Sequence, residues 1–430
     1  MNKNDFAVYP PMGWNSWDCY GAAVNEEQVM GNAEYMHKYL QQFGYEYVVV
    51  DIEWSDPGAR SMEYRKFAHL EMDEYSRLMP APKRFPSAAG GVGFRSMADR
   101  VHDMGLKFGI HIMRGIPRQA VYMGTHIKGT EYTAGDIAHP YSVCSWNTEM
   151  YGVDVNHPGA QAYYDSIIEL YASWGVDFIK CDDICVTEGR PDNLYSGKGE
   201  IECLRRAIDK CGRPIVLSLS PGPADIRNAE HLKANANMWR MTGDFWDSWD
   251  ALNSMFDRCR TWQEHVGTGC WPDCDMLPLG HISIYNGDRW TNFTHDEQKT
   301  LMTLWCIFRS PLMMGGEMRD NDDFTLNLLT NPEVLALEKE TSGAREVMNA
   351  EGVTVWKTGD ADGNIYLAVF NRDCFKKDIS IGFAGLRMDH RATYSVRDLW
   401  ERKDICDMSG ELAAPVNAHG AVLYRLTKKQ

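Results

Sequence analysis

The stretch Pro158–Asp183, PGAQAYYDSIIELYASWGVDFIKCDD, contains the unit on which the predicted fold depends. Within Pro158–Trp174, large apolar side chains recur at spacings of three and four, the period of an amphipathic helix, and a proline suits its first turn. Asp177–Asp183 follows as a short apolar run, which is typical of a strand buried on both faces. We therefore predict a helix followed by a buried strand that ends in two aspartates.

The same alternation extends over residues 1–340. Apolar runs predict further strands at Tyr45–Trp54, Leu106–Met113, Ile215–Ser220, Met238–Asp244 and Pro311–Gly316. Helical patterns lie between them, at Asn25–Gln42, Phe94–Met104, Glu200–Cys211, Ser248–His265 and Asp296–Phe308. This repetition favours a parallel α/β fold, and the length fits an eight-unit (β/α)8 TIM barrel better than an open sheet. We assign residues 1–340 to a catalytic barrel.

The chain changes character from about Ser342. Short alternating segments are joined there by Gly, Asp and Asn turns, as in Val353–Lys357 and Asn364–Asn371. This pattern is typical of antiparallel sheets, so we predict a small C-terminal antiparallel β-sandwich domain over residues 341–430. In the barrel, residues 114–157 form the longest stretch without strong periodicity, which is typical of a functional loop or lid.

Charge and composition exclude several kinds of partner. The formal net charge is −16, which argues against nucleic acid or an anionic membrane as a partner, because binding a polyanion needs a basic surface. No run approaches the roughly 18 apolar residues of a membrane helix. The N-terminus has no apolar export signal, so we expect the twelve cysteines to be reduced and the protein to be cytoplasmic. A homo-oligomer is left open.

Acidic residues fall at the ends of four predicted strands. They are Asp51 and Glu53, Asp182 and Asp183, Asp244, and the pair Asp273 and Asp275. A carboxylate at the carboxyl end of a barrel strand points into the mouth, where barrel active sites are built. Any one of them could instead be a helix cap or a turn residue. Four acidic strand ends together favour a site.

Two kinds of chemistry use several convergent carboxylates. Glycoside hydrolysis needs a nucleophile or base and an acid. Divalent metal chemistry also uses carboxylates, and Asp273 and Asp275 could bind Mg²⁺ or Mn²⁺. Lys180 would repel a cation and would hold Asp182 ionised, so we predict no metal. Arg240 lies four residues before Asp244, an even spacing that predicts the same face of a strand. Zinc and nucleotide motifs are missing, so no cofactor is predicted.

Several sequence blocks together resemble a known family. They include MGWNSW at Met12–Trp17, WGVDFIKCDD at Trp174–Asp183, DSW at Asp247–Trp249 and WPDCDML at Trp271–Leu277. The chain resembles, over nearly its whole length, the melibiase-type glycoside hydrolases of family 27. These include α-galactosidases, α-N-acetylgalactosaminidases and β-L-arabinopyranosidases. The resemblance implies a retaining α-glycoside hydrolase that releases terminal α-galactose-type sugars from an oligosaccharide or glycoside.

The resemblance also implies roles for individual residues. Asp182 corresponds to the nucleophile and Asp244 to the acid/base. For the two-step mechanism Asp182 should be ionised at rest and Asp244 protonated through burial and the charge of Asp182, with the carboxyl groups roughly 5–6 Å apart. The residues expected to bind the sugar are Trp17, Asp51, Glu53, His111, Lys180, Ser220, Arg240, Asp273 and Asp275.

Three departures from the family pattern lie at substrate-recognition positions. Ile52 replaces the second aspartate of a sugar-binding pair, and strand alternation predicts that Glu53 shares the face of Asp51 and takes its place. Cys274 replaces a proline. Ser220 replaces a glutamate, which implies either room for a 2-acetamido group or a different loop path imposed by prolines. We therefore expect an α-galactosidase, with the N-acetylgalactosaminidase and arabinopyranosidase activities as alternatives. A non-catalytic sugar-binding barrel and a metal-dependent isomerase or lyase are the rivals from other classes.

Overall fold

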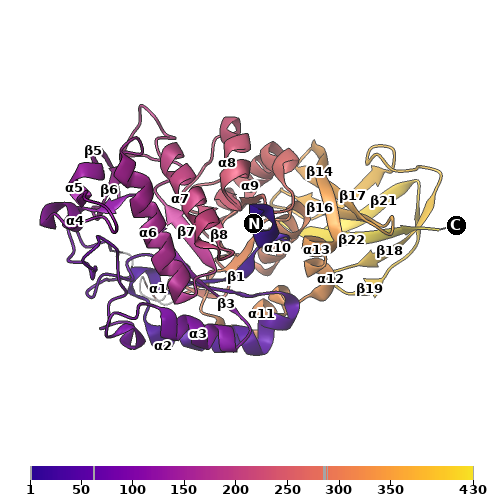
Figure 1. The fold of residues 1–430 in the computed structure, drawn as a ribbon. Helices are drawn as coiled ribbons and strands as arrows, with labels where there is room; N and C mark the ends of the chain where they lie inside the picture. The colour runs from indigo at the N-terminus through magenta and orange to yellow at the C-terminus, as the bar shows by residue number, and fades with distance from the viewer. Residues whose placement is uncertain (1, 62, 284–286, 288, 430) are drawn as a thin grey trace.

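The structure is a computed structural model that describes residues 2–61, 63–283, 287 and 289–429. The remaining residues of the two predicted domains (Met1, Met62, 284–286, 288 and Gln430) lie outside the described residues. Figure 1 shows a sheet wrapped by helices, joined at one side to a β-domain that contains the C-terminus.

In the described residues, eight parallel strands form one sheet in the order β10-β9-β8-β7-β3-β2-β1-β13. Their bounds are β1 Met12–Asn15, β2 Tyr47–Val50, β3 Lys107–Met113, β7 Phe178–Asp182, β8 Val216–Leu219, β9 Met238–Arg240, β10 Trp271–Asp273 and β13 Leu312–Met314. A parallel bridge between Leu277 and Met314 joins the two ends of the sheet beyond β10. The predicted barrel is confirmed.

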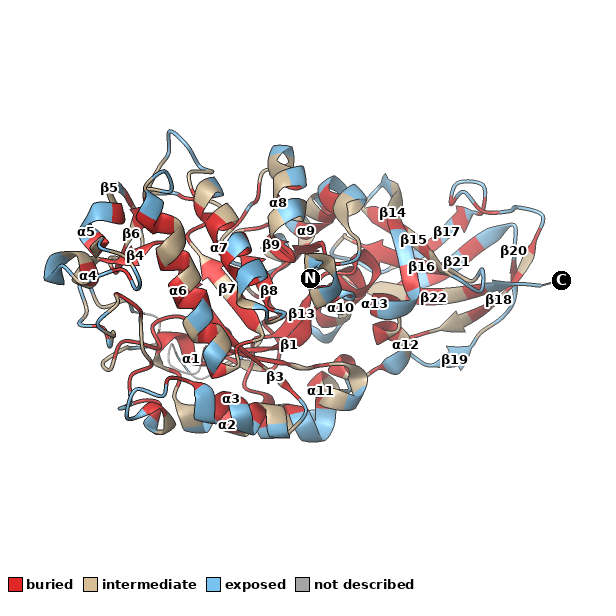
Figure 2. Ribbon diagram, viewed as in Figure 1, coloured by how far each residue is buried: buried red, intermediate tan, exposed pale blue. Residues whose placement is uncertain are grey.

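Helices cover the outside of this sheet, and one face of most of them is buried (Figure 2). Their bounds are α2 Glu26–Tyr35, α3 Arg95–Asp103, α6 Pro158–Trp174, α7 Lys198–Cys211, α8 Ala229–Asn235, α9 Trp249–Trp262 and α10 His295–Phe308, followed by α11 Asp323–Leu329, α12 Pro332–Leu335 and α13 Leu337–Glu340. The predicted helix Pro158–Trp174 has the observed bounds of α6, because Pro158 begins it and Gly175, in a left-handed conformation with φ 88°, ends it.

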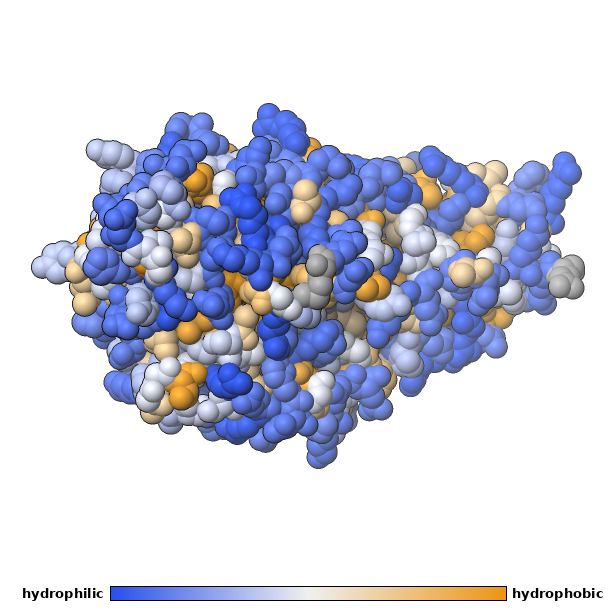
Figure 3. Space-filling view, viewed as in Figure 1, coloured by the Kyte–Doolittle hydropathy of each residue, from blue (hydrophilic) through white to orange (hydrophobic). Residues whose placement is uncertain are grey.

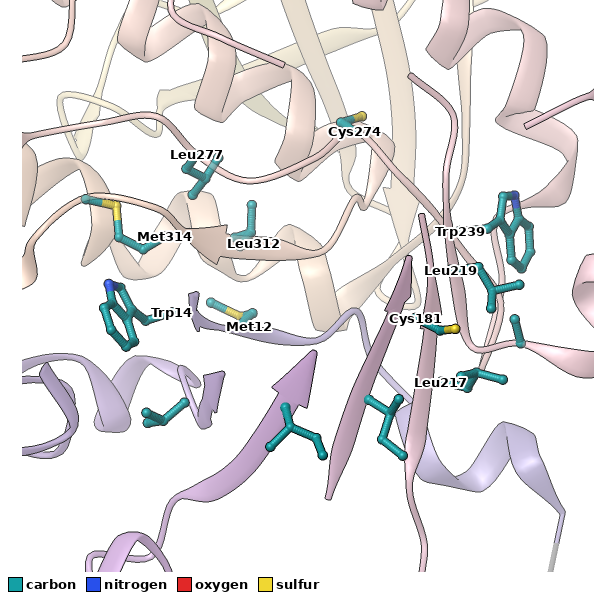
Figure 4. Packing of buried hydrophobic residues seen from close by; sticks show 14 of the residues in the cluster. Met12, Trp14, Cys181, Leu217, Leu219, Trp239, Cys274, Leu277, Leu312 and Met314 are labelled. Atoms are coloured by element: carbon teal, nitrogen blue, oxygen red, sulfur yellow. The ribbon is translucent and has the colours of Figure 1, made fainter. Parts of the chain in front are cut away.

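The strands place alternate side chains in two different cores. Figure 4 shows Met12, Trp14 and Leu217 among the side chains of the largest cluster, which the helices share. A smaller cluster contains the side chains on the other face of the strands, such as Tyr47, Val49, Phe178, Val216, Met238 and Trp271. This second set fills the barrel with apolar side chains below its mouth.

Two predicted strands are too long. The strand predicted at Tyr45–Trp54 ends at Val50, and the one predicted at Met238–Asp244 ends at Arg240. A run of apolar residues indicates that a segment is buried, but it does not show where the strand ends. The loops after both strands are also buried, so the apolar run continues beyond the last hydrogen-bonded residue. The chain therefore leaves the regular strand conformation just where the predicted site begins.

The segment 114–157 has secondary structure of its own. Strands β4 Ile116–Pro117, β6 Met150–Val153 and β5 Ala138–Val143 form an antiparallel sheet beside helices α4 Arg118–Met123 and α5 Ala134–Ile137. It lies at the end of the molecule opposite the C-terminus (Figure 1). The predicted functional loop is thus a small folded insertion after β3.

Strand β14 Thr341–Ala350 is the first described strand of the C-terminal antiparallel sheets. An antiparallel sheet contains β14, β15 Val353–Asp360, β16 Ile365–Asn371, β22 Ala421–Lys428, β18 Thr393–Asp398, β19 Lys403–Asp404 and β20 Met408–Ser409. A second sheet pairs β17 Lys377–Gly382 with β21 Glu411–Val416. Buried side chains of both sheets form one apolar cluster, so the predicted β-sandwich is confirmed.

Helix α10 packs against the C-terminal sheet and connects the two parts. No helix in the described part of the chain is long and apolar enough to cross a membrane. Figure 3 shows a face that is mostly hydrophilic, with hydrophobic residues scattered over it.

Candidate active site

A cavity of about 360 Å³ lies at the carboxyl ends of the barrel strands. Its described lining consists of Trp17, Asp18, Asp51, Tyr64, Trp146, Lys180, Asp182, Glu188, Pro221, Gly222, Arg240, Gly243, Asp244, Phe245, Trp246, Asp275 and Met276. Seven of the residues predicted to form the site are in this lining, and four are not: Glu53, His111, Ser220 and Asp273.

Strand alternation explains why two of the lining residues lie together. On β7, Phe178 points into the barrel, so Lys180 and Asp182 share its face at spacings of two. Ile179 and Cys181 point the other way, into the core shared with the helices. The motif Lys-x-Asp therefore places an ammonium and a carboxylate in the same cavity.

Asp51 is held ionised by its neighbours. Its Oδ2 accepts hydrogen bonds from Asn15 Nδ2 at 2.7 Å and from Lys180 Nζ at 2.8 Å, and its Oδ1 accepts one from the Ile52 N–H at 2.8 Å. Burial alone would raise the pKa of Asp51, but the charges of Lys180 and His111 outweigh it and lower the pKa. The Asp51 carboxylate is thus a fixed acceptor at the cavity wall.

Asp182 is also surrounded by groups that stabilise its charge. His111 Nε2 lies 3.2 Å from its Oδ2, and the Asp183 N–H donates to its Oδ1 at 3.1 Å. Burial would raise the pKa of Asp182, but the His111 hydrogen bond and the Lys180 charge outweigh burial and hold the pKa well below its usual value. An ionised carboxylate in the cavity is what a nucleophile requires.

Asp244 differs from the prediction in two ways. Its side chain is 65% exposed, so the predicted burial is wrong. Strand β9 ends at Arg240, so the two residues do not share a strand face; the chain turns over residues 241–244 instead. In this turn Arg240 donates to the Gly243 carbonyl at 2.7 Å and to Asp244 Oδ1 at 3.0 Å.

Asp273 and Asp275 lie at two different depths in the barrel. Asp275 lines the cavity and forms an ion pair with Arg240 at 2.8 Å. Asp273 lies in the barrel below it and accepts a hydrogen bond from the Asp275 N–H at 2.9 Å. Burial and the charge of Asp275 raise the pKa of Asp273 to about 7. Asp273 therefore supports the loop of Asp275 and is not in the described cavity lining.

Glu53 does not replace the missing aspartate of the pair. Strand β2 ends at Val50, so the alternation that predicted its direction does not reach it, and Glu53 has a left-handed φ of 62°. Its Oε1 is 3.5 Å from Asn147 Nδ2, in a buried cluster behind the cavity wall. Ile52 is a buried member of the apolar cluster against which Trp17, Tyr64 and Trp146 pack, and it is not among the described residues that line the cavity.

Ser220 and His111 lie beneath the surface of the cavity. Ser220 is 1% exposed, and its backbone oxygen accepts hydrogen bonds from the segment after Asp182, at 3.1 Å from Ile184. The following Pro221 and Gly222 line the cavity, and Ser220 is not among its described lining residues. Room for a 2-acetamido group in front of Ser220 stays a prediction. His111 is also buried and contacts Asp182, not the cavity.

Several lining residues were not predicted from the sequence. Asp18 is buried, and its Oδ2 accepts no hydrogen bond from a described residue; its position next to Trp17 was the available signal. Tyr64 stacks on Trp17 with ring centroids 5.9 Å apart, and Trp146 lies 5.5 Å from Tyr64. These two rings come from long loops without periodicity, and no spacing rule connects them to the barrel.

In the described residues, no group of three or more His, Cys, Asp or Glu side chains has the arrangement of a metal site. Asp275 pairs with Arg240, and Asp51 and Asp182 surround Lys180. The arrangement therefore combines fixed cations, carboxylates and aromatic rings around a cavity of sugar size. A barrel with several carboxylates at its mouth and aromatic walls is typical of a glycoside hydrolase.

Comparison with known proteins gives the family. The protein-family model described as alpha galactosidase A matches residues 9–155 and 150–340, and the family model of the alpha galactosidase C-terminal beta sandwich domain matches residues 350–426. The chain belongs to this melibiase-type family, glycoside hydrolase family 27, and is an α-galactosidase-type enzyme that hydrolyses O-glycosyl bonds.

Its relatives include enzymes for different sugars. A β-L-arabinopyranosidase of family 27 from Geobacillus stearothermophilus, solved in complex with arabinose, is 55% identical with a TM-score of 0.97, and the alignment covers 100% of both chains. The structure of a putative α-N-acetylgalactosaminidase from Bacillus halodurans is 48% identical over 98% of this chain and 97% of that chain, with a TM-score of 0.87. An α-galactosidase from Cyamopsis tetragonoloba is 27% identical over 100% of this chain and 89% of its own length.

Proposed function

We propose that this enzyme is a retaining β-L-arabinopyranosidase. The observation that carries this proposal is the wall beside Asp51: Tyr64 and Trp146 line the cavity there, and they pack against a buried apolar cluster that contains Ile52 in place of a carboxylate. β-L-Arabinopyranose has the ring hydroxyl arrangement of α-D-galactopyranose but has no hydroxymethyl group at C5. Ile52 cannot accept a hydrogen bond as an aspartate would, and this suits the smaller sugar, because a buried hydroxyl without a partner is costly.

The comparisons support the same choice. Identity is 55% to the arabinopyranosidase and 27% to the plant α-galactosidase, both over the whole of this chain. An α-galactosidase is the second candidate, because Asp51 and Lys180 still present charged groups to the ring hydroxyls.

The reaction follows a double displacement. Asp182, ionised at rest, attacks the anomeric carbon, and Asp244 donates a proton to the leaving oxygen. Water then hydrolyses the glycosyl-enzyme, with Asp244 as the base. The exposed position of Asp244 at the cavity rim suits this role when the leaving group covers it. We expect the two carboxyl groups to lie roughly 5–6 Å apart, as in retaining enzymes.

The remaining lining residues bind the sugar in this proposal. Trp17 provides an apolar surface for the pyranose ring, and Tyr64 stacked on it makes that surface rigid. Asp51 and Lys180 bind ring hydroxyls. Arg240 positions Asp244 and Asp275.

The test is a hydrolysis screen with four p-nitrophenyl glycosides: β-L-arabinopyranoside, α-D-galactoside, α-N-acetylgalactosaminide and α-glucoside. We expect kcat/KM for the arabinoside to exceed that for the galactoside by about tenfold or more, the range for one extra group in an apolar pocket. A higher kcat/KM for the galactoside would overturn the choice of sugar and leave the enzyme class unchanged.

Ile52→Asp tests the wall directly. An aspartate at this position can accept a hydrogen bond from a hydroxymethyl group, so the ratio of galactoside to arabinoside kcat/KM should rise by about tenfold. Ile52→Val is the matched control, since it keeps an apolar side chain and should keep the preference for the arabinoside. Equal ratios in the two variants would show that Ile52 does not select the sugar.

A further inference from the structure

The residue after the nucleophile has an unusual backbone conformation. Asp183 has φ 53°, the left-handed region that residues other than glycine rarely adopt. In this conformation its N–H points back and donates to Asp182 Oδ1 at 3.1 Å. His111 Nε2 contacts the other oxygen of the same carboxylate at 3.2 Å. The turn at Asp183 thus supplies one of these two contacts that orient the nucleophile.

Arg114 holds this turn in place. It follows β3, the neighbour of β7 in the sheet, and its backbone N–H donates to the Asp182 carbonyl at 3.0 Å. Its guanidinium donates to the Asp183 carbonyl at 2.6 Å through Nε, and to Asp183 Oδ2 at 2.7 Å. These three hydrogen bonds reach the residues on both sides of the peptide bond that orients the carboxylate.

Arg114 is itself fixed from behind. Its guanidinium forms an ion pair with Glu200 at 2.9 Å and donates to Ser142 Oγ at 2.9 Å. Glu200 in turn accepts hydrogen bonds from the Tyr164 hydroxyl at 2.6 Å and from the Val153 N–H at 3.1 Å. Glu200 thereby connects helices α6 and α7 to the insertion after β3.

This network is buried and separate from the sugar. The side chains of Arg114, Asp183 and Glu200 are 1%, 3% and 3% exposed. None of them is in the lining of the cavity in the part of the chain that the structure describes. Arg114 is a single cation that forms ion pairs with two carboxylates, Asp183 and Glu200, so the positive and negative charges of this network are unequal in number. A group that affects the reaction from this position must act through Asp182.

We propose that Arg114 and Asp183 are positioning residues that hold the Asp182 carboxylate in its attacking orientation, with Glu200 as the anchor of Arg114. This inference rests on the proposed role of Asp182. The alternative is a network that only stabilises the fold. Loss of a purely structural network lowers the melting temperature, but it does not selectively slow the chemical step of the folded enzyme.

The test compares Asp183→Ala with Asp183→Asn. Asparagine tolerates the left-handed conformation and still offers an acceptor to Arg114, whereas alanine offers no acceptor and disfavours this conformation. We expect Asp183→Ala to lower kcat about 10- to 100-fold, as small misplacements of reacting groups do, with KM and the inhibition constant of the free sugar released from the assay glycoside changed by less than about threefold. Asp183→Asn should stay within about fivefold of the wild-type kcat.

Two further variants keep the test decisive. Asp183→Gly permits the turn but removes the side-chain contact with Arg114. Arg114→Lys keeps the positive charge but cannot donate to both the Asp183 carbonyl and its side chain as the guanidinium does. Each should lower kcat and leave KM nearly unchanged, and either replaces Asp183→Ala if that variant does not fold. A wild-type kcat in these variants, or a loss in KM alone, would overturn the inference.

The assay uses the glycoside that the wild-type enzyme hydrolyses fastest, so an incorrect choice of sugar does not affect it. Full activity in Asp182→Asn would reject the proposed nucleophile. Activity lost in Asp182→Asn but kept in Asp183→Ala would reject only the positioning role.

Discussion

The two candidate catalytic aspartates line the same cavity in contrasting surroundings. Asp182 is the last residue of β7, its side chain is 14% exposed, and its carboxylate contacts His111 of β3 and the N–H of the following residue, Asp183. Asp244 lies four residues beyond the last residue of β9, is 65% exposed, and contacts Arg240 from its own turn. The carboxylate of Asp182 is therefore held in one orientation in the ligand-free protein, whereas Asp244 is largely open to solvent; in the proposed reaction a leaving group would cover it.

This difference has a chemical reason. A nucleophile must be ionised and aligned at the start of the reaction, which burial among hydrogen-bond donors and cations achieves. An acid that later acts as a base must exchange protons with a leaving group and then with water, which requires access from solvent. Variants of the two aspartates and of the side chains near them test this contrast.

Asp182→Asn should give the largest loss. The amide keeps the shape but cannot form the glycosyl-enzyme, so turnover should fall by at least about four orders of magnitude, comparable to losing a nucleophile elsewhere. Steady-state rates on the p-nitrophenyl arabinoside measure this, and circular dichroism checks the fold. A loss below tenfold would place the nucleophile elsewhere.

Asp244→Asn should depend on the leaving group. A general acid contributes roughly 10²- to 10⁴-fold when the leaving group is poor, and little when it is an activated phenol. The burst of nitrophenol release in the first step should therefore be nearly preserved, whereas hydrolysis of an alkyl glycoside should fall by that range. Equal losses on both substrates at the first step would show that Asp244 is not the acid.

The parts of this contrast that the sequence predicted are those that follow strand periodicity. Lys180 and Asp182 are among the last residues of a regular strand, so a spacing of two was sufficient to place both in the barrel mouth. The helix Pro158–Trp174 was placed correctly because a proline and a glycine mark its ends.

The parts that the sequence did not predict depend on where a strand stops. Glu53 and Asp244 were assigned by extending β2 and β9 beyond their last hydrogen-bonded residues. Glu53 is not in the described cavity lining, and Asp244 reaches the cavity from a turn and is exposed, not buried. Tyr64 and Trp146 come from segments far apart in the chain whose meeting depends on tertiary packing. Apolar runs report burial, but burial does not show which side of the cavity wall a residue occupies.

His111→Phe should shift the pH dependence. The His111 hydrogen bond lowers the pKa of Asp182, so its removal raises that pKa and more of the nucleophile is protonated in acid. The acid limb of kcat/KM should move to higher pH by up to about one unit, with a smaller change near neutrality. His111→Tyr is the matched control because a tyrosine can still donate to Asp182. An unchanged acid limb in His111→Phe would mean that Lys180 alone sets the ionisation.

Glu53→Gln should have the smallest effect on activity and a distinct effect on stability. Burial, and then the charge of Glu149, raises the pKa of Glu53, and burial also raises the pKa of Glu149. Glu53 Oε2 and Glu149 Oε1 accept no hydrogen bond from any described residue. The folded state therefore keeps protons that the unfolded chain releases above about pH 4.5, so unfolding becomes easier as the pH rises from there through neutrality. Glutamine is neutral at every pH, so the variant should lose less stability between about pH 5 and about pH 8, with a melting temperature about 1–3 °C above wild type at the upper end. Its KM for the arabinoside should stay within about twofold, because Glu53 lies behind the wall; a tenfold rise in KM would return Glu53 to the sugar-binding residues.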